Sequence, residues 1–389
     1  MSGNDRLLTD QSAGQGGETT AREIAQQPEV WRETERVVAS RQEDIDAFLR
    51  PLLEQPDLRI ILTGAGTSAF AGEILAPALS RRTGHRVDAV ATTDIVSNPK
   101  EYFANDGPTL LVSFARSGNS PESVAATELA DRLLPGCHHL ILTCDRDGQL
   151  YEKHAGSDGS FILLMPEATN DQGFAMTSSF TSMTLAAWLI LGRVSDAGEL
   201  AGRLATAAEK LLDTREEEIR ELASSGYKRV VFLGSGPLRG LAHESSLKLL
   251  ELTAGGIVTY FESPLGFRHG PKSILDDRTL AVLYVSGDEY TRKYDLDLLK
   301  ELKNSMPPGN VVAVSGTEGW AEDPGFWLVE GVDGVDDAAL ALPFVVVAQL
   351  LGLFFSLKLG YTPDNPFPNR EVNRVVQGVS IHPLEDGSS

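Results

Sequence analysis

Short apolar runs rich in β-branched residues recur along this chain, separated by segments of helical length. The run Arg59–Thr67 ends in glycines, and a similar unit returns 170 positions later as Arg229–Pro237. Further apolar runs follow each copy at nearly the same offset: Leu110–Val112 against Leu280–Val282, and Leu140–Thr143 against Val311–Val314. Buried strands that alternate with helices are typical of parallel sheets. The pattern therefore predicts two copies of one α/β domain in a single chain.

The segments around the two copies complete the expected organisation. We expect residues 1–20 to be disordered, 21–55 to form N-terminal helices, 56–195 the first α/β domain, 196–224 a connecting amphipathic helix, 225–360 the second α/β domain and 361–389 a tail rich in Pro and Asn. Thr20–Glu23 fits a capping box that opens a helix. Within the tail, Asn369–Val376 is predicted to form a last short helix.

Composition places the chain among globular proteins. Its 389 residues are 42% hydrophobic and 23% charged, which is ordinary for two domains. Ala338–Leu359 is the most apolar segment and is predicted to be a buried helix, because polar residues interrupt it. No stretch near the N-terminus resembles a signal peptide, so we expect a cytoplasmic protein. Cys137 and Cys144 are then expected to be free thiols.

The net charge of −21 limits the partners that we expect. Such a charge argues against nucleic acids and anionic membrane surfaces. An anionic small ligand would have to be held locally, by backbone N–H groups, hydroxyls and a helix N-terminus.

The glycine-rich loop of the first copy has two interpretations. Gly64–Ala69 matches a loose dinucleotide-binding pattern, with Asp88 about 20 residues further on as the acidic partner. The second copy breaks this pattern at Arg239, and Thr67 and Ser68 supply hydroxyls that a dinucleotide loop does not need. We favour a phosphate-binding turn, in which glycines allow close approach and hydroxyls donate to the phosphate.

A second hydroxyl-rich loop follows the next strand of the same predicted sheet. Ser113–Glu122 contains Ser117, Gly118 and Ser120, and Pro121 opens the following helix. Such a loop presents hydroxyls and free N–H groups to an anion. The alternative is an ordinary helix cap by Ser120. Two such loops at successive strand ends favour the phosphate site.

The second copy carries candidate acid–base residues instead. Glu244, Lys248 and Glu251 occupy one stripe of a predicted helix. A surface ladder of ion pairs is one interpretation. Near a ligand crevice, however, a lysine between two carboxylates could keep one of them ionised as a base. His269 lies in an irregular loop between Arg268 and Gly270, where it is either a solvated side chain or a functional one.

Together these motifs resemble the sugar isomerase (SIS) family. The paired domains, the two hydroxyl loops, the acidic helix and the Arg268–Pro271 loop are most similar to double-SIS sugar-phosphate enzymes, including the isomerase half of glucosamine-6-phosphate synthase. Thr20–Pro28 and Phe267–Ser273 resemble the AgaS group more specifically, described as galactosamine-6-phosphate deaminase/isomerases or tagatose-6-phosphate ketose/aldose isomerases. The resemblance implies two tandem SIS domains, each a five-stranded parallel sheet flanked by helices.

The resemblance also implies roles for individual residues. Glu251 would move a proton between C1 and C2 of the sugar, Glu244 and Lys248 would complete its surroundings, and His269 would assist ring opening, usually in the site of a neighbouring subunit. The sugar phosphate would be bound by the two loops, through Gly66, Thr67, Ser68, Arg116, Ser117, Gly118 and Ser120. No metal and no other cofactor is implied, and the protein would be a homodimer or larger homo-oligomer with shared active sites.

Two positions depart from glucosamine-6-phosphate synthase. Ala115 and Arg116 replace a serine and a glutamine, and the Arg116 guanidinium could pair directly with phosphate. Gln377 stands nearest to the position of a C-terminal lysine associated with ring opening, so His269 or another group would take that role. The function expected is conversion of galactosamine 6-phosphate to tagatose 6-phosphate and ammonia. Aldose–ketose isomerisation without deamination, and a non-catalytic sugar-phosphate-binding module, are the alternatives.

Overall fold

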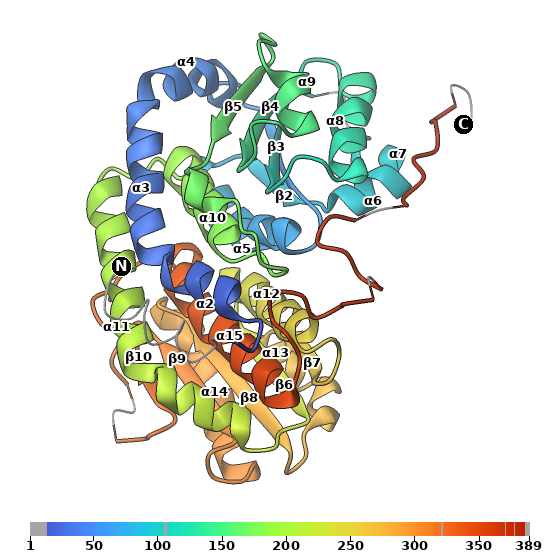
Figure 1. Ribbon diagram of the computed structural model, residues 1–389. Helices are drawn as coiled ribbons and strands as arrows, with labels where there is room; N and C mark the ends of the chain where they lie inside the picture. Colours follow the sequence, from blue (N-terminus) through green and yellow to red (C-terminus); the bar gives the residue numbers. More distant parts are fainter. Residues whose placement is uncertain (1–13, 105–106, 320–321, 370, 377, 386–389) are drawn as a thin grey trace.

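The protein contains two five-stranded, wholly parallel sheets flanked by helices, as predicted (Figure 1). The computed structural model describes residues 14–104, 107–319, 322–369, 371–376 and 378–385. The strand order is β2-β1-β3-β4-β5 in one sheet and β7-β6-β8-β9-β10 in the other, so the two repeats share one topology. The strands are β1 Arg59–Thr63, β2 Arg86–Ala89, β3 Thr109–Ala115, β4 Cys137–Thr143, β5 Ser160–Leu164, β6 Arg229–Gly234, β7 Val258–Glu262, β8 Thr279–Val285, β9 Val311–Ser315 and β10 Phe326–Leu328.

Strand register brings the two hydroxyl loops together. Thr63 at the end of β1 lies opposite Ser113 in β3. The chain leaves β1 into the Gly64 loop and leaves β3 into the Arg116 loop, so both loops lie at the carboxyl edge of one sheet. Ligands of open parallel sheets bind at this edge.

Helices cover the sheets and connect the repeats. The first repeat contains α5 Thr67–Thr83, α6 Thr92–Ser97, α7 Pro99–Tyr102, α8 Pro121–Leu133, α9 Gln149–His154, the 3₁₀ turn η1 Glu167–Thr169 and α10 Ser178–Leu191. The second contains α12 Pro237–Leu252, α13 Pro264–Phe267, the 3₁₀ turn η2 Pro271–Ile274, α14 Glu289–Ser305 and α15 Asp337–Leu359. Between them, α11 (Ala197–Ser224) connects α10 to β6, where the amphipathic pattern predicts a connecting helix.

Helix α15 forms part of the core, as the apolar segment predicts. It is long and apolar enough to cross a membrane, but the whole of its most apolar window is buried inside the protein. It packs against α11 and α12 and also contacts α5 and α10. Burial among other helices accounts for its apolar character on all sides.

The N-terminal helices differ in detail from the prediction. They are α2 Glu18–Ala25, α3 Gln27–Ser40 and α4 Gln42–Leu53. Thr20 lies inside α2, so the predicted capping box at Thr20–Glu23 is wrong. Asp364 of the C-terminal tail accepts hydrogen bonds from the amides of Thr19 (3.1 Å) and Thr20 (2.7 Å), and thus caps α2 from a distance. Most of the predicted disorder over residues 1–20 falls on residues 1–13, outside the described residues. Over residues 18–20 the prediction is wrong, because α2 begins at Glu18.

A buried polar network attaches the N-terminal helices to the core. Gln27 donates to Gln349 of α15 at 2.6 Å and accepts from Thr181 of α10 at 2.9 Å. Trp31 donates to the same Thr181 hydroxyl at 2.9 Å. Because buried polar groups are costly unless hydrogen-bonded, this network fixes α3 against both central helices.

The two repeats meet where α5 packs on α12. Gly240 of α12 lies so close to α5 that a Cβ at this position would come within 2.7 Å of the Ile74 amide nitrogen and 2.8 Å of the Glu73 carbonyl carbon. The missing side chain therefore permits the close approach of the helices. On the same interface His243 binds Glu73 (3.0 Å). This packing places α12 of the second repeat beside the Gly64 loop of the first.

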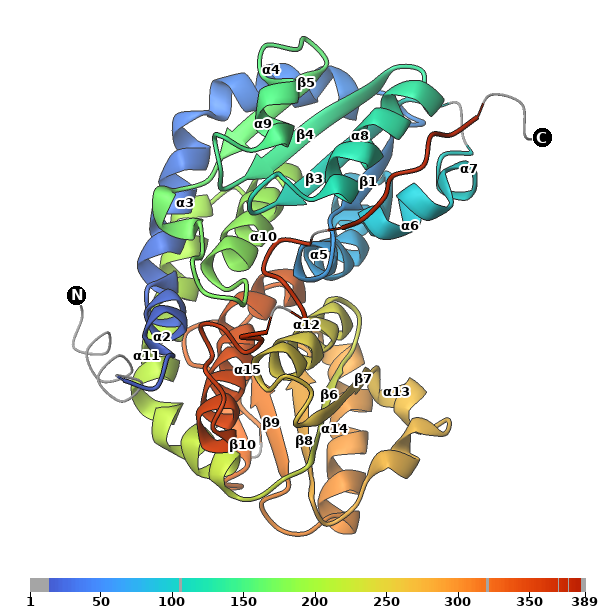
Figure 2. The same cartoon turned by 45° about the vertical axis from the view of Figure 1, so that its right-hand side comes forward.

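The C-terminal tail returns from α15 to the first repeat (Figure 2). The predicted helix over Asn369–Val376 is wrong, because the described residues of this stretch form bends without helical structure. Further along, the tail passes α6 and α8, where Arg132 donates to the Leu384 carbonyl at 2.5 Å.

Candidate active site

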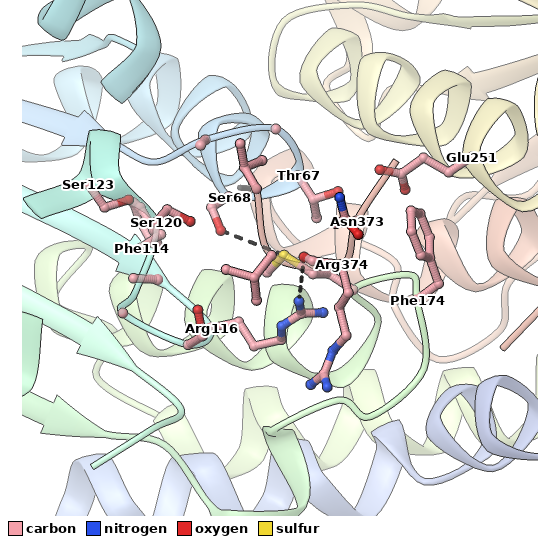
Figure 3. A pocket seen from close by; sticks show the side chains of 18 of the residues that line it. Thr67, Ser68, Phe114, Arg116, Ser120, Ser123, Phe174, Glu251, Asn373 and Arg374 are labelled. Atoms are coloured by element: carbon pink, nitrogen blue, oxygen red, sulfur yellow. Dashed lines mark hydrogen bonds between the residues drawn. The ribbon is translucent and has the colours of Figure 1, made fainter. Parts of the chain in front are cut away.

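A cavity of about 190 Å³ lies between the two hydroxyl loops of the first repeat, α12 and the C-terminal tail (Figure 3). Nine of the eleven residues predicted for the site line it. They are Gly66, Thr67, Ser68, Arg116, Ser117, Gly118, Ser120, Lys248 and Glu251. Residues from both repeats therefore form one site, although the two sets of motifs are far apart in the sequence.

The Gly64 loop leads directly into the N-terminus of α5. Gly66 has a φ of +54°, a conformation that L side chains rarely adopt, and it precedes the first helical residue, Thr67. No side chain caps this helix. The amides of Ser68 and Ala69 donate to the carbonyls of Ala65 and Gly66 within the turn. The hydroxyls of Thr67 and Ser68, at the start of α5 and on residues that line the cavity, are therefore the groups of this loop that suit an anion.

The second loop ends at the N-terminus of α8, which is also uncapped by a side chain. Ser120 occupies the position before Pro121, yet its hydroxyl makes no capping hydrogen bond. The interpretation of Ser120 as an ordinary cap is therefore wrong. Ser117 accepts a hydrogen bond from the Asn119 amide at 3.3 Å. The Ser120 hydroxyl lies at the cavity and is not used by its helix.

Arg116 is a buried cation with unused donors. Its guanidinium donates from Nη2 to the Arg374 carbonyl at 3.0 Å. In the part of the chain that the structure describes, the buried Nε and Nη1 have no hydrogen-bond partner. Burial lowers the pKa of Arg116, and the nearby Arg374 side chain lowers it further. An anion in the cavity would offset both effects.

Asp88 does not support the dinucleotide interpretation. It forms ion pairs with Arg59 (2.6 Å) and Arg86 (2.9 Å). It pairs with Ile61 within the sheet, before the carboxyl end of β1, and does not line the cavity. The acidic residue at the dinucleotide spacing therefore has a structural role.

Glu244, Lys248 and Glu251 form a mostly buried triad on α12. Lys248 Nζ lies 3.3 Å from Glu244 Oε1 and 2.9 Å from Glu251 Oε2, and donates to Thr67 Oγ1 at 2.9 Å. Glu244 and Lys248 are completely buried, whereas the Glu251 side chain is 26% exposed. The triad is therefore not a ladder on the protein surface, and Glu251 is the member that combines cavity exposure with a fixed cation.

The electrostatics of the triad divide its roles. Burial, opposed by Lys248 and assisted by the Glu251 charge, raises the pKa of Glu244 to about 7. Burial by itself would lower the pKa of Lys248, but the two carboxylates outweigh it and raise the pKa. Lys248 thus stays protonated and attracts the charge of Glu251, while Glu244 can hold a proton near neutral pH.

The equivalent loops of the second repeat are filled by the protein itself. By strand register, Ser286 and Gly287 correspond to Arg116 and Ser117. Ser286 donates its hydroxyl to Asp337 (2.5 Å) and its amide to Asp295 (2.9 Å), and the Gly287 amide donates to Asp337 (2.7 Å). In the second repeat, carboxylates of the protein therefore accept hydrogen bonds from Ser286 and Gly287. The corresponding residues of the first repeat, Arg116 and Ser117, line the cavity.

Two predicted site residues lie elsewhere. Glu244 is behind Lys248 and does not line the cavity. His269 is exposed between α13 and η2 and does not reach the cavity of its own chain. Gln377 lies outside the described residues. In the part of the chain that the structure describes, no three His, Cys, Asp or Glu side chains are grouped as a metal site requires.

Several lining residues were missed by sequence analysis. Phe174 and Met176 come from the segment before α10, and Val372–Val376 from the tail. The first segment is held by Asp171, whose carboxylate accepts from the amides of Thr177 (2.8 Å) and Ser179 (2.9 Å) at the start of α10. The stretch between β5 and α10 is long for a connection, and such connections are often functional.

Comparison with known proteins identifies the family. Residues 52–193 match the SIS domain. The AgaS protein of Streptomyces coelicolor is 56% identical over 370 residues, which are 94% of this chain and 96% of the relative. D-galactosamine-6-phosphate deaminase AgaS of Shewanella sp. strain ANA-3 is 44% identical, over 97% of this chain and 95% of its own.

A solved structure is similar over almost the whole chain. The crystal structure of tagatose-6-phosphate ketose/aldose isomerase from Escherichia coli has a TM-score of 0.87 and 42% identity, covering 95% of this chain and 98% of that one. The two sequence matches and the structural match each cover at least 94% of this chain. The chain therefore belongs to the AgaS family of SIS-domain proteins.

Proposed function

We propose that this protein is an amino-sugar-6-phosphate deaminase/isomerase that converts galactosamine 6-phosphate and water to tagatose 6-phosphate and ammonia. The observation that carries the proposal is the position of Glu251. Its carboxylate reaches the cavity 2.9 Å from Lys248, while the hydroxyl loops of the other repeat line the same cavity. The relative from Shewanella carries the name of this activity.

The loops of the first repeat are suited to hold the 6-phosphate. Ser68, Ser117 and Ser120 supply hydroxyls at the cavity. They lie at the starts of α5 and α8 or in the loop that leads to α8, and no side chain of the described residues caps either helix. Arg116 contributes two donors, Nε and Nη1, that have no hydrogen-bond partner among the described residues. These local donors allow a chain of net charge −21 to bind a phosphate ester.

Glu251 is the proposed base for the proton transfer. Once the ring is open, Glu251 removes the C2 proton, and an enolamine forms as the electrons move toward the aldehyde. Return of this proton from Glu251 to C1, with transfer of one amine N–H proton to O1, produces the imine at C2. Water then adds to C2, ammonia leaves, and the ketose phosphate remains. These residues carry out the sequence by acid–base catalysis, with Lys248 holding the Glu251 carboxylate in position.

Isomerisation of a sugar phosphate without deamination is the second candidate. It is favoured by the name of the similar E. coli structure. Both reactions begin with ring opening and loss of the C2 proton, so the triad serves either. The substituent on C2 distinguishes them, since only an amine leads to an imine that water can hydrolyse.

We further propose that the protein acts as a homo-oligomer in the cytoplasm, with His269 completing a neighbour's site. His269 is exposed and lies away from its own cavity. Near it in the chain, β7 is an edge strand, and Val258 and Leu265 are 53% and 46% exposed. Exposed apolar side chains beside an unpaired strand edge are suited to a contact between subunits.

Ammonia release tests the proposal. Purified protein is incubated with galactosamine 6-phosphate, glucosamine 6-phosphate and tagatose 6-phosphate, and ammonia and sugar products are measured. Ammonia with equimolar tagatose 6-phosphate from the first substrate supports deamination. Interconversion of tagatose and galactose phosphates without ammonia from either amino sugar would favour the isomerase instead.

A further inference from the structure

The sugar that occupies the cavity has a defined direction. The phosphate-binding loops lie on one side of the cavity and Glu251 on another (Figure 3). With the phosphate of a hexose 6-phosphate at the loops and C1–C2 at Glu251, the middle carbons C3 and C4 lie between them. Galactosamine and glucosamine 6-phosphates differ only in configuration at C4, so the side chains in the middle of the cavity decide between them.

Asn373 is the polar side chain best placed to read this region. In the view of Figure 3 its side chain is drawn beside Thr67, with Ser120 to the left and Glu251 to the right, and all four residues line the cavity. Of its neighbours along the cavity, Phe174 and Met176 are apolar, and the Thr67 hydroxyl already accepts from Lys248 at 2.9 Å. An asparagine amide both donates and accepts hydrogen bonds, so Asn373 can bind a sugar hydroxyl either as the donor or as the acceptor.

The tail is anchored so that Asn373 has a fixed position. The carbonyl of the next residue, Arg374, accepts from Arg116 at 3.0 Å. The Arg374 guanidinium donates to the Asp171 carbonyl, and the Asp171 side chain is itself bound to the start of α10. Figure 3 shows the Asn373 and Arg374 side chains turned to opposite sides. Arg374 therefore fixes the tail while Asn373 faces the cavity.

We propose that Asn373 is the specificity-determining residue that bonds the C4 hydroxyl of the amino-sugar phosphate. This inference rests on the proposed function and names the group that selects the substrate within the same site. A residue that bonds a substrate hydroxyl discriminates against an epimer that points this group elsewhere, because its polar atoms are then left without a partner.

The contact is tested by removing the Asn373 side chain, the C4 hydroxyl of the substrate, or both. Values of kcat/KM for ammonia release are measured for wild type and Asn373→Ala with galactosamine 6-phosphate and 4-deoxygalactosamine 6-phosphate. Wild type should lose about tenfold on the deoxy substrate. With galactosamine 6-phosphate, kcat/KM of Asn373→Ala should be about tenfold lower than that of wild type. Within Asn373→Ala, removing the C4 hydroxyl from the substrate should lower kcat/KM little further. Asn369→Ala is the matched control, since Asn369 lies in the same tail and bonds Glu371 at 3.2 Å.

The outcomes separate this inference from the proposed function. If wild type releases no ammonia from galactosamine 6-phosphate, the proposed function itself fails. If wild type is active and Asn373→Ala still distinguishes the deoxy substrate as strongly as wild type does, Asn373 does not contact the C4 hydroxyl and the inference is overturned. Loss of that discrimination in Asn373→Ala, but not in Asn369→Ala, supports it.

Discussion

Lys248 Nζ donates a 2.9 Å hydrogen bond to Thr67 Oγ1, a contact between residues 181 positions apart in the sequence. It joins α12 of the second repeat to the Gly64 loop of the first. The same ammonium group contacts Glu244 and Glu251. It therefore makes hydrogen bonds to Thr67 and Glu251 and an ion pair with Glu244, so the group is suited to fix Glu251 relative to the Gly64 loop rather than to attack a substrate carbonyl.

Glu244 should make folding stability depend on pH. Its pKa is about 7 in the folded protein and near 4.5 when exposed. Between these values the folded state keeps a proton that the unfolded state has released, so the free energy of unfolding falls as pH rises. In Glu244→Gln this fall should be smaller by about 1–3 kcal/mol, as measured by urea unfolding at pH 4.5 and 7.5.

Other buried carboxylates also make the free energy of unfolding fall as pH rises, but they do not affect the comparison of wild type with Glu244→Gln. Burial raises the pKa of Glu23 to about 7 and that of Asp295 to about 6. Both are present in wild type and in Glu244→Gln, so the difference between the two curves isolates Glu244. Parallel curves would show that Glu244 ionises alike in the folded and unfolded states.

Ser120→Ala separates a phosphate ligand from a helix cap. Since the Ser120 hydroxyl does not cap α8, its removal should change the free energy of unfolding by less than about 0.5 kcal/mol, whereas loss of a real cap costs about 1 kcal/mol. KM for the sugar phosphate should rise about tenfold with little change in kcat. The exposed Ser225→Ala is the control. A destabilised variant with unchanged KM would restore the capping interpretation.

A mixing experiment tests the shared site. If His269 acts in a neighbour's cavity, His269→Ala and Glu251→Gln are each inactive as pure proteins. Mixed dimers after subunit exchange contain one site with both native residues, and random mixing should recover about a quarter of wild-type activity. The measurement is ammonia release before and after exchange. No recovery between exchanged subunits would place His269 outside the partner's site.

Much of the fold could be predicted because it depends on local patterns. Apolar runs and glycine turns located β1, β3, β6 and β8, and the composition of Ala338–Leu359 predicted a buried helix. The errors arose where distant residues replace local ones. Asp364 caps α2 in place of Thr20, and the tail around Arg374 follows its contacts with Arg116 and Asp171 in place of forming a helix.

The site was predicted in part for the same reason. Hydroxyl loops and the acidic stripe are visible as motifs, so Ser117, Ser120 and Glu251 could be named from sequence. The burial of Glu244 could not, because it depends on packing between the repeats. Asn373 and Phe174 carry no motif, and only the three-dimensional arrangement brings the tail and the segment before α10 to the cavity.

Glu251→Gln is the most direct test of the account. Glutamine keeps the size of the side chain but cannot accept the C2 proton, so kcat for ammonia release from galactosamine 6-phosphate should fall by about 10²–10⁴. Binding of the substrate, measured by calorimetry, should change little because the phosphate loops are intact. A Glu251→Gln protein that retains wild-type turnover would contradict the assignment of Glu251 as the base.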